Sequence, residues 1–300
     1  MSAAPSIFTL TGNLLCERTL DFADWSIGKT QRASRESFQV GGKGINVAKM
    51  LQRLDAKPTA LCFTGGATGA ECEAWLREQK FAHRAFPCVR ANRVGIVIRS
   101  GQHPETTFFS PDVAPDAAAI RACVGFLDAQ PAGQVLAFCG SFPGWDSGDV
   151  EPLRAALTRW LARGILAADS YGPPLAWLVA QPLALVKINA TELRTLFPDE
   201  SATTSTATLL ASAAQRWPTR NWIVTDGGGP LWMCEAGAHP TSIKPPSVKE
   251  VSPTGSGDVL FASVLDSLYR RQRSLTEAVT TAIPLASANA AHPGIAEFPM

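Results

Sequence analysis

The sequence predicts an α/β fold in which helices cover both faces of a doubly wound, mostly parallel sheet. Short apolar runs alternate along the chain with helical patterns of ~10–15 residues, which is typical of βαβ units. Hydrophobic residues make up 46% of the 300 residues, enough for a large core, and this excludes a disordered protein. No internal repeat and no long linker divides the chain.

The expected strands are short apolar runs at residues 6–11, 59–64, 134–139, 165–168, 183–188 and 221–225. The expected helices carry apolar residues at helical spacing and cover residues 45–54, 70–79, 116–128, 150–163 and 204–216. After residue 226 the pattern changes. Residues 231–235 are expected to form an edge hairpin, and two helices at 256–270 and 275–291 follow it.

Two stretches do not follow this alternation. Residues 16–40 and about 88–110 are polar and extended, with strand-like patches at 94–99 and 106–110. Long irregular insertions in a compact α/β protein usually form lids or binding segments. Surface decoration without a function is the alternative interpretation.

Charge and composition exclude several classes of function. Lys and Arg (27) nearly balance Asp and Glu (26), so we do not expect a protein that neutralises many nucleic-acid phosphates. The seven cysteines and four histidines are scattered, without the spacing of a metal site or a disulfide framework. The chain starts without the pattern of a secretory leader, and no run of ~18 apolar residues occurs. We expect a cytoplasmic protein with no membrane or nucleic-acid partner.

Glycines come directly before an expected helix in the segment Gly41-Gly42-Lys43-Gly44-Ile45-Asn46. Backbone N–H groups can approach an anionic ligand closely at such a helix start. Lys43 adds a cation for a phosphate, and Asn46 offers a donor and an acceptor on the first turn. A glycine-rich helix start with a solvated lysine explains the same residues equally well.

A second glycine-rich helix start is Pro253-Thr254-Gly255-Ser256-Gly257-Asp258. Free N–H groups in this segment would form an anion hole for charge that develops on a transferring phosphoryl group. Asp258 lies on the first turn, where a carboxylate can accept a proton from an attacking hydroxyl. The alternative is an aspartate that only stabilises the start of the helix.

Three further segments give weaker signals. Lys187-Ile188-Asn189-Ala190-Thr191-Glu192 opens a helix, and the spacing of Asn189 and Glu192 fits either a hydrated Mg²⁺ or a capping box. Thr225-Asp226-Gly227-Gly228-Gly229 ends a strand in a flexible turn that a nucleotide could cross, or in an ordinary glycine turn. Gly28-Lys29-Thr30 imitates a P-loop, but no apolar helix follows it, so Lys29 is at most a cation on a mobile segment.

Taken in order, these segments resemble the ribokinase-like carbohydrate kinases of the phosphofructokinase-B type over essentially the whole chain. The branch that contains 1-phosphofructokinase and tagatose-6-phosphate kinase has a first signature like Gly41–Ala48. Its second signature, D-T-x-G-A-G-D, matches Pro253–Asp258 in both glycines and the aspartate. Lys187–Glu192 corresponds to a K-P-N-x-x-E segment, and Gly140-Ser141-Phe142-Pro143 corresponds to a G-S-x-P turn beside the sugar site.

The resemblance implies one ribokinase-like domain over residues 1–300, with a small β-sheet lid from segments at approximately 14–40 and 88–112. It also implies ATP and Mg²⁺ as cofactors and a homodimer that pairs through the lid. The catalytic group would be Asp258, with the N–H groups of Gly255, Ser256 and Gly257 as the anion hole. The implied contacts to the sugar substrate come from Glu17, Lys29, Gly42, Lys43, Asn46, Arg93 and Ser141. The implied contacts to the nucleotide come from Asn189, Glu192, Thr225, Gly227, Gly255, Gly257 and Asn289, and Glu192 would also hold Mg²⁺ through water.

Two positions depart from the family pattern. The branch begins N-P-x-x-D, whereas this chain has Asn13-Leu14-Leu15-Cys16-Glu17, so its carboxylate extends one methylene further toward the sugar. The usual T-L-G-x-x-G is Thr225-Asp226-Gly227-Gly228-Gly229-Pro230, and Asp226 would repel nucleotide phosphates unless it points away.

The function expected from these residues is ATP-dependent phosphorylation of a phosphorylated ketohexose: fructose 1-phosphate, fructose 6-phosphate or tagatose 6-phosphate. Lys43, Arg93 and Lys29 supply the cations for the second phosphate. Two alternatives stay open. One is a kinase for an unphosphorylated sugar or a nucleoside, and the other is a non-catalytic sugar- or nucleotide-binding regulator with the same fold.

Overall fold

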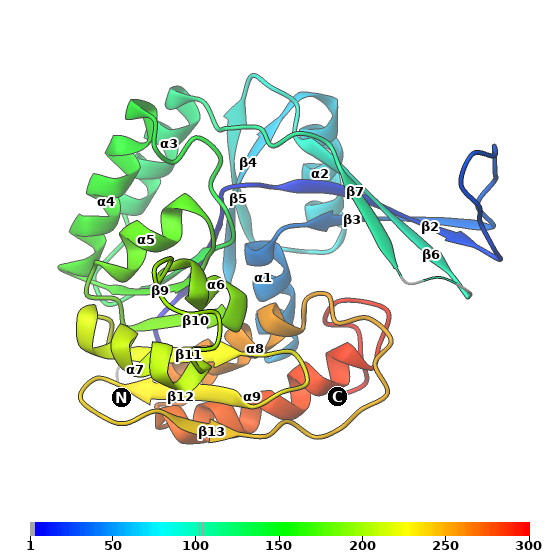
Figure 1. Ribbon diagram of the computed structural model, residues 1–300. Coiled ribbons are helices and arrows are strands. Elements are labelled where there is room, and N and C mark those ends of the chain that lie inside the picture. The colour runs from blue at the N-terminus through cyan, green and yellow to red at the C-terminus, as the bar shows by residue number, and fades with distance from the viewer. Residues whose placement is uncertain (1–3, 102, 104) are drawn as a thin grey trace.

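The computed structural model describes residues 4–101, 103 and 105–300, and a large, mostly parallel sheet runs through its centre (Figure 1). The strand order is β13-β12-β11-β10-β9-β8-β1-β4-β5. All pairings from β5 to β11 are parallel, and β12 and β13 add antiparallel strands at one end. The bounds are β1 Ile7–Thr11, β4 Thr59–Gly65, β5 His83–Cys88, β8 Val135–Cys139, β9 Ile165–Asp169, β10 Leu185–Asn189, β11 Asn221–Thr225, β12 Leu231–Glu235 and β13 Thr241–Ile243.

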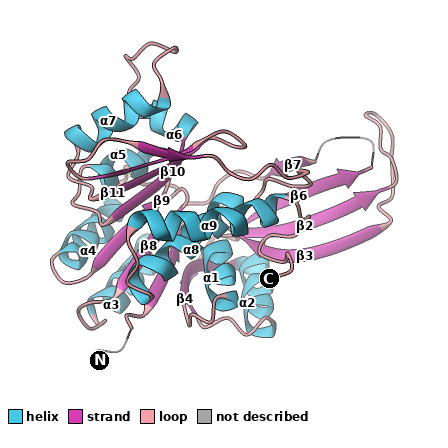
Figure 2. Cartoon of the chain, turned by 90° about the horizontal axis from the view of Figure 1, so that it is seen from below, coloured by secondary structure: helices cyan, strands magenta, loops and turns pink. Residues whose placement is uncertain are grey.

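Helices pack on both faces of this sheet, and the expected doubly wound α/β class is thereby confirmed (Figure 2). One face is covered by α3 (Ala117–Asp128), α4 (Glu151–Leu161), α5 (Pro173–Val179), α6 (Ala190–Thr195) and α7 (Thr206–Arg216). The other face is covered by α1 (Lys43–Arg53), α2 (Gly66–Glu78), α8 (Ser256–Leu265) and α9 (Leu275–Ala290). Two short helical segments complete the set, η1 (Gly148–Val150) and the π-helical η2 (Asp266–Arg270). The strands between these layers are buried along their length, which explains their continuous apolar runs.

The sequence missed several elements at the margins of the sheet. Strand β5 was not expected, and it contains Pro87, which a sheet tolerates on an edge strand. Residues 231–235 form β12, and the edge hairpin expected there is completed by β13, an outer strand that was not expected. The single helix expected over 256–270 is α8 followed by the π-helical turn η2. Helix α5 begins with two prolines, and its seven residues are too few for a clear period.

The two irregular stretches form a second sheet that projects from the main body (Figure 1). Its order is β3-β2-β6-β7, from β2 (Leu15–Phe22), β3 (Arg35–Gly41), β6 (Arg93–Ser100) and β7 (Thr106–Phe109). Strand β2 pairs antiparallel with β3 and parallel with β6, so segments about 80 residues apart lie side by side. Residues 102 and 104, in the second stretch, lie outside the described residues.

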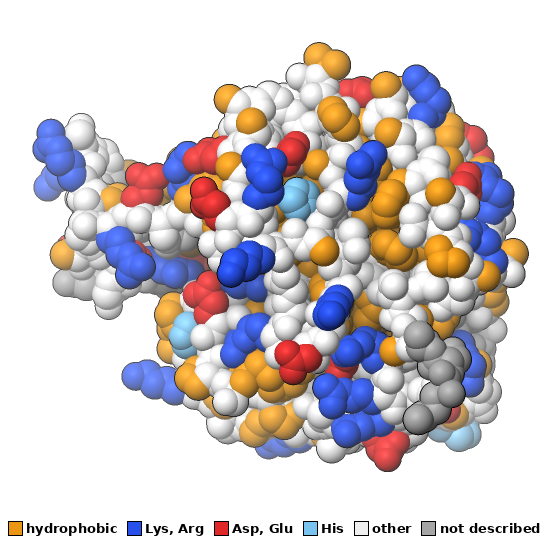
Figure 3. Space-filling model, turned by 180° about the vertical axis from the view of Figure 1, so that it is seen from behind, with side chains coloured by type: hydrophobic (Ala, Val, Ile, Leu, Met, Phe, Trp, Pro, Cys, Tyr) orange, Lys and Arg blue, Asp and Glu red, His pale blue; other side chains and the backbone are white. Residues whose placement is uncertain are grey.

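The surface carries a mixture of charges. Lys and Arg side chains are spread over the face seen in Figure 3, with Asp and Glu among them. The seven cysteines are free thiols. In the part of the chain that the structure describes, no helix has the length and apolarity needed to span a bilayer. The cytoplasmic location stays a prediction.

Candidate active site

A cavity of about 700 Å³ opens at the carboxyl ends of the parallel strands. Thr11, Cys139, Asn189 and Thr225 end β1, β8, β10 and β11, and all four line it. Ligands bind outside the carboxyl ends of strands in open α/β sheets because loops and helix N-termini converge there. The N-termini of α1 and α8 meet at this cavity, so both glycine-rich motifs of the sequence contribute to one site.

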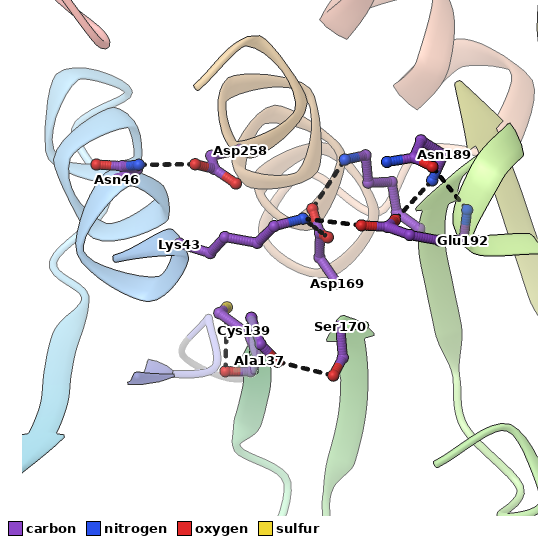
Figure 4. A network of polar contacts seen from close by, with 11 residues as sticks. Lys43, Asn46, Ala137, Cys139, Asp169, Ser170, Asn189, Glu192 and Asp258 are labelled. Carbon is purple, nitrogen blue, oxygen red and sulfur yellow. Dashed lines mark hydrogen bonds and ion pairs between the residues drawn. The ribbon is translucent and has the colours of Figure 1, made fainter. Parts of the chain in front are cut away.

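Asp258 lies on the first turn of α8 and is 6% exposed. Asn46, on the first turn of α1, donates a hydrogen bond from Nδ2 to Oδ2 of Asp258 over 2.7 Å (Figure 4). Burial raises the pKa of Asp258 from 3.8 to about 6, although the nearby ammonium groups of Lys43 and Lys187 oppose that effect. A carboxylate with a raised pKa that remains ionised near neutral pH is suited to act as a general base.

The loop before Asp258 contains a glycine in the left-handed conformation and a second glycine that lies close to a lysine. Gly255 has φ of 77°, and a Cβ there would lie 2.4 Å from a side-chain carbon of Ile295. A Cβ on Gly257 would lie 2.4 Å from Nζ of Lys187. The backbone therefore lies close against a lysine ammonium, and the start of α8 directs free N–H groups into the cavity, which Gly255, Ser256 and Gly257 line.

The side chain of Asn289 anchors this loop through hydrogen bonds. It is fully buried, donates to the carbonyl of Thr254 over 3.0 Å and to Oγ of Ser256 over 3.1 Å, and accepts from the N–H of Ala296 over 2.7 Å. It does not line the cavity. The resemblance implied a nucleotide contact for Asn289, whereas the structure gives its amide the role of a loop anchor.

A buried ion triad lies beside Asp258, and the sequence did not identify its centre. Asp169, at the end of β9, is fully buried and accepts from Nζ of Lys43 over 2.6 Å and from Nζ of Lys187 over 2.8 Å (Figure 4). Burial by itself would raise the pKa of Asp169, but attraction to both lysines lowers it. Burial likewise acts to lower the pKa of Lys43, and attraction to the three carboxylates Asp169, Asp258 and Glu192 outweighs it and raises that pKa. The carboxyl of Asp169 and the ammonium of Lys43 therefore each favour the charged form.

The position of Asp169 in the sequence offers a signal that could have found it. It directly follows the buried run Ile-Leu-Ala-Ala of an expected parallel strand. A charged residue at the carboxyl end of such a strand lies at the edge where ligands bind. Lys187 holds the corresponding position near the end of β10, and it is 3% exposed.

Asn189 and Glu192 form a complete capping box at the start of α6. Oδ1 of Asn189 accepts from the N–H of Glu192 over 2.7 Å, and Oε2 of Glu192 accepts from the N–H of Asn189 over 2.8 Å. Oε1 of Glu192 lies 3.8 Å from Nζ of Lys43. Among residues 4–101, 103 and 105–300, no group of three or more His, Cys, Asp or Glu could hold a metal ion by itself.

One end of the cavity lies against the second sheet, and we call it the acceptor end. It is lined by Asn13, Gly42, Arg93 and Ser141, all expected substrate contacts except Asn13. Nδ2 of Asn13 donates to Oγ of Ser141 over 3.0 Å and to Oδ1 of Asp112 over 2.9 Å. Neither Asn13 nor Asp112 was assigned a role from the sequence.

Two expected substrate residues do not line the cavity. Glu17 on β2 is hydrogen-bonded to Gln39 on β3, and burial raises its pKa. Lys29 is exposed in the loop between β2 and β3, at the far end of the projecting sheet (Figure 1). The structure thus separates Lys29 from the other expected cations, Lys43 and Arg93, which line the cavity.

The opposite end of the cavity, which we call the nucleotide end, is wide and partly apolar. Its walls are the turn 225–229, the loop 244–248 and the side of α9 with Ile283, Ala286 and Ala290. Lys244 adds a cation, and Thr225, Asp226 and Gly227 line the same wall. Asp226 is exposed within this turn, and its backbone carbonyl accepts from the N–H of Gly229 over 2.7 Å.

Comparison with known proteins gives consistent matches. Residues 16–299 match the model of the pfkB family of carbohydrate kinases. A 1-phosphofructokinase of Bacillus subtilis is 26% identical over 287 residues, which cover 95% of this chain and 92% of that protein. A tagatose-6-phosphate kinase of Staphylococcus epidermidis is 25% identical over 274 residues, 89% of this chain and 86% of the relative. The crystal structure of phosphofructokinase-2 from Escherichia coli in complex with fructose-6-phosphate shares the fold, with a TM-score of 0.85, 23% identity and coverage of 96% of this chain and 94% of that one.

Proposed function

The chain belongs to the pfkB family of carbohydrate kinases, and from this membership and the surroundings of Asp258 we propose that it transfers the γ-phosphoryl group of ATP to a hydroxyl of a phosphorylated ketohexose. The observation that carries the proposal is the buried carboxylate of Asp258, with a pKa raised to about 6, next to the free N–H groups at the start of α8. A base and an anion hole side by side are what phosphoryl transfer to a hydroxyl requires.

In the proposed reaction, Asp258 removes the proton of the acceptor hydroxyl while its oxygen attacks the γ-phosphorus. A new O–P bond forms, the bond from the γ-phosphorus to the bridging oxygen breaks, and ADP leaves. The N–H groups of Gly255, Ser256 and Gly257 hold the charge on the transferring group. Asn46 keeps the carboxylate of Asp258 oriented through its 2.7 Å hydrogen bond. Lys43 and Lys187 supply positive charge on the side of the cavity toward Asp169.

We assign ATP to the nucleotide end of the cavity. The apolar side of α9 offers a surface for a purine ring, and the turn 225–229 and Asn189 border the path toward Asp258. The side chains present fit an Mg²⁺ ion held mainly by phosphates and water, because Mg²⁺ usually binds through one or two carboxylates and keeps several waters. Oε1 of Glu192, free of hydrogen bonds in its capping box, is the protein group suited to such a water. Bound there, the ion would neutralise charge on the phosphates.

The acceptor class follows from the cations of the acceptor end and from the relatives. Arg93 and Lys43 line the cavity and could bind a phosphate. The 1-phosphofructokinase and the tagatose-6-phosphate kinase are by name kinases of phosphorylated ketohexoses. Fructose 1-phosphate, fructose 6-phosphate and tagatose 6-phosphate are the acceptors that we propose. We also propose that Glu17 contacts hydroxyls of the sugar. Because Glu17 does not line the cavity, this contact requires a movement of the four-stranded sheet, which contains Glu17 in β2.

We further propose that the four-stranded sheet is a lid of a single kinase domain. Closure over the acceptor would exclude water and favour transfer to the sugar over hydrolysis of ATP. Pairing of two copies through this sheet is the homodimer that we propose. Sedimentation that shows only a monomer at tens of micromolar would contradict this dimer.

A kinase for an unphosphorylated sugar is the second candidate, and one observation favours it. Arg93 is paired with Asp112 over 3.0 Å, so the charge that would attract a substrate phosphate is already balanced. A coupled assay of ADP release over fructose 1-phosphate, fructose 6-phosphate, tagatose 6-phosphate, fructose and ribose separates the two candidates. Turnover of only the unphosphorylated sugars would refute the proposed acceptor class. Binding of nucleotide or sugar without turnover of any of them would favour a non-catalytic regulator.

A further inference from the structure

Arg93 is the cation of the acceptor end that lies nearest the second sheet, at the start of β6. Its side chain is 12% exposed and lies over the ring of Phe109, with 5.2 Å between Cζ and the ring centroid. Nη2 donates to the carbonyl of Asn13 over 3.3 Å, and Nη1 donates to Asp112 over 3.0 Å. Nε is buried and has no hydrogen-bond partner among the described residues. The guanidinium is thus held in position, and both of its terminal nitrogens are engaged, Nη1 by Asp112 and Nη2 by Asn13.

Asp112 lies between β7 and α3 and makes two contacts with a single oxygen. Oδ1 accepts from Nη1 of Arg93 and, over 2.9 Å, from Nδ2 of Asn13. The Asp112 side chain is nevertheless 54% exposed. It is therefore free to leave Arg93 by rotating into water.

The two expected phosphate-binding cations that line the cavity differ in how firmly a carboxylate neutralises them. Lys43 is paired with Asp169, which is fully buried and shared with the buried Lys187, so this carboxylate cannot leave without stranding the buried charge of Lys187. Arg93 is paired with Asp112, which is half-exposed and forms no ion pair with a second cation among the described residues. A phosphate that enters the acceptor end can therefore displace a carboxylate at Arg93 but not at Lys43.

A carboxylate and a phosphate are equivalent ligands for a guanidinium, because both present oxygens that accept its N–H groups. Bound to Arg93, Asp112 occupies a donor that a substrate phosphate needs. Turned away from Arg93, it still leaves a negative charge within a few ångströms of an incoming dianion. Both effects weaken the binding of a phosphorylated acceptor and do not act on a neutral sugar.

We propose that Asp112 is a specificity-determining residue, which competes with the phosphate of the acceptor for Arg93 and so sets the preference between phosphorylated and unphosphorylated sugars. This inference rests on the proposed function, since it concerns the acceptor end of that site. Removal of the Asp112 charge frees Arg93 and adds one positive charge to the net charge of the acceptor end.

The test uses Asp112→Asn, which keeps the size and the acceptor oxygen, together with Arg93→Gln and the double variant. Asp128→Asn is the matched control, because Asp128 also forms an exposed pair with an arginine, Arg159, over 2.7 Å, on the outer surface of α3. Each variant is assayed for kcat and KM with fructose 6-phosphate and with fructose, and for inhibition by inorganic phosphate. Thermal melting verifies that each variant is folded.

The expected result is a KM for fructose 6-phosphate that is about two- to five-fold lower in Asp112→Asn, the upper part of the range of a partly exposed charge pair. Inorganic phosphate should inhibit more strongly by a similar factor, while kcat and the KM for fructose stay within twofold. In the Arg93→Gln background the same substitution should lower the KM by a clearly smaller factor, because only the direct repulsion between Asp112 and the phosphate remains. Asp128→Asn should behave as the wild type.

Three results would overturn the inference. They are an unchanged or higher KM for fructose 6-phosphate, an equal change for both sugars, and an effect of the same size without the Arg93 guanidinium. Failure of the proposed function looks different. If the wild type phosphorylates only free sugars, the proposed acceptor class is refuted. If it phosphorylates no sugar, the proposed activity is refuted. The Asp112 inference is then decided by calorimetric binding of fructose 6-phosphate, which Asp112→Asn must still tighten.

Discussion

Replacement of Asp258 by Asn separates a catalytic base from a residue that only starts a helix. Asn keeps the shape of the side chain and can still accept the hydrogen bond from Asn46. It cannot take a proton from a hydroxyl. General-base catalysis typically contributes ~10²–10⁴-fold in rate, so kcat should fall by about that factor while the KM for each substrate changes little.

The same substitution lowers kcat but should not lower the stability of the protein at pH 8, because Asp258 is buried. The pKa of Asp258 is raised from 3.8 to about 6 in the folded protein, and that difference corresponds to about 3 kcal/mol. Because the folded state binds this proton more tightly than the unfolded chain, the contribution to stability is lost as pH rises from about 4 to about 6. Above that range the charged carboxylate destabilises the fold. At pH 8, Asp258→Asn should therefore unfold at an equal or higher urea concentration than the wild type.

Three measurements examine this reasoning together: kcat and KM at pH 8, urea unfolding at pH 5 and pH 8, and the pH profile of kcat/KM. The wild-type profile should rise with pH to a plateau above about 6, as Asp258 becomes ionised. A loss of kcat below about fivefold on the best substrate would refute the assignment as a base. A variant that is less stable than the wild type at pH 8 would refute the account of its burial.

Three further substitutions extend the predictions to the rest of the site. Asp169→Asn should destabilise the protein by ~3–5 kcal/mol in urea unfolding, because the buried ammonium of Lys187 and the partly buried ammonium of Lys43 lose their shared carboxylate. A loss below about 1 kcal/mol would contradict the described triad. Asn289→Ala removes three hydrogen bonds of a buried side chain, each costing ~1–3 kcal/mol, so melting temperature and kcat should both fall. A normal kcat in a folded variant would show that the loop needs no anchor. Asp226→Asn should lower the KM for ATP several-fold through loss of a negative charge at the nucleotide end, without change in the KM for sugar; an unchanged KM for ATP would mean that this carboxylate points away from the phosphates.

Most of the main sheet could be predicted because buried parallel strands and amphipathic helices leave separate periods in the sequence. Strands β1, β4, β8 and β11 begin and end within one residue of the expected ranges. The projecting sheet was predicted only in part. Strands β6 and β7 coincide with the strand-like patches expected at 94–99 and 106–110, whereas β2 and β3 were not expected as strands. Most residues of β2 and β3 are exposed or only partly buried, so these strands show no continuous apolar run. The parallel pairing of β2 with β6 also joins segments that no local signal connects.

The site residues that belong to a glycine-rich helix start could be predicted from the sequence. Those that stand alone, outside any motif, could not. Asp258 and Asn46 belong to such motifs, and the structure brings them within one hydrogen bond of each other. Asp169 and Asp112 carry no motif, and their partners are distant in sequence, so their importance arises only from tertiary contacts. The sequence also could not show that Lys29 would lie at the tip of a projecting loop.

The two ends of the cavity are formed by different parts of the chain, so the acceptor end and the nucleotide end can change separately in evolution. Apart from Ser141, the acceptor end is made by residues 13–112, whereas the turn, loop and helix of the nucleotide end come from residues 225–290. The contact between Asn46 and Asp258 joins the two parts. Mutation and recombination within the first part can therefore change the sugar that is accepted without disturbing the phosphoryl donor. A lineage built in this way can explore new sugars while it keeps one common source of phosphate.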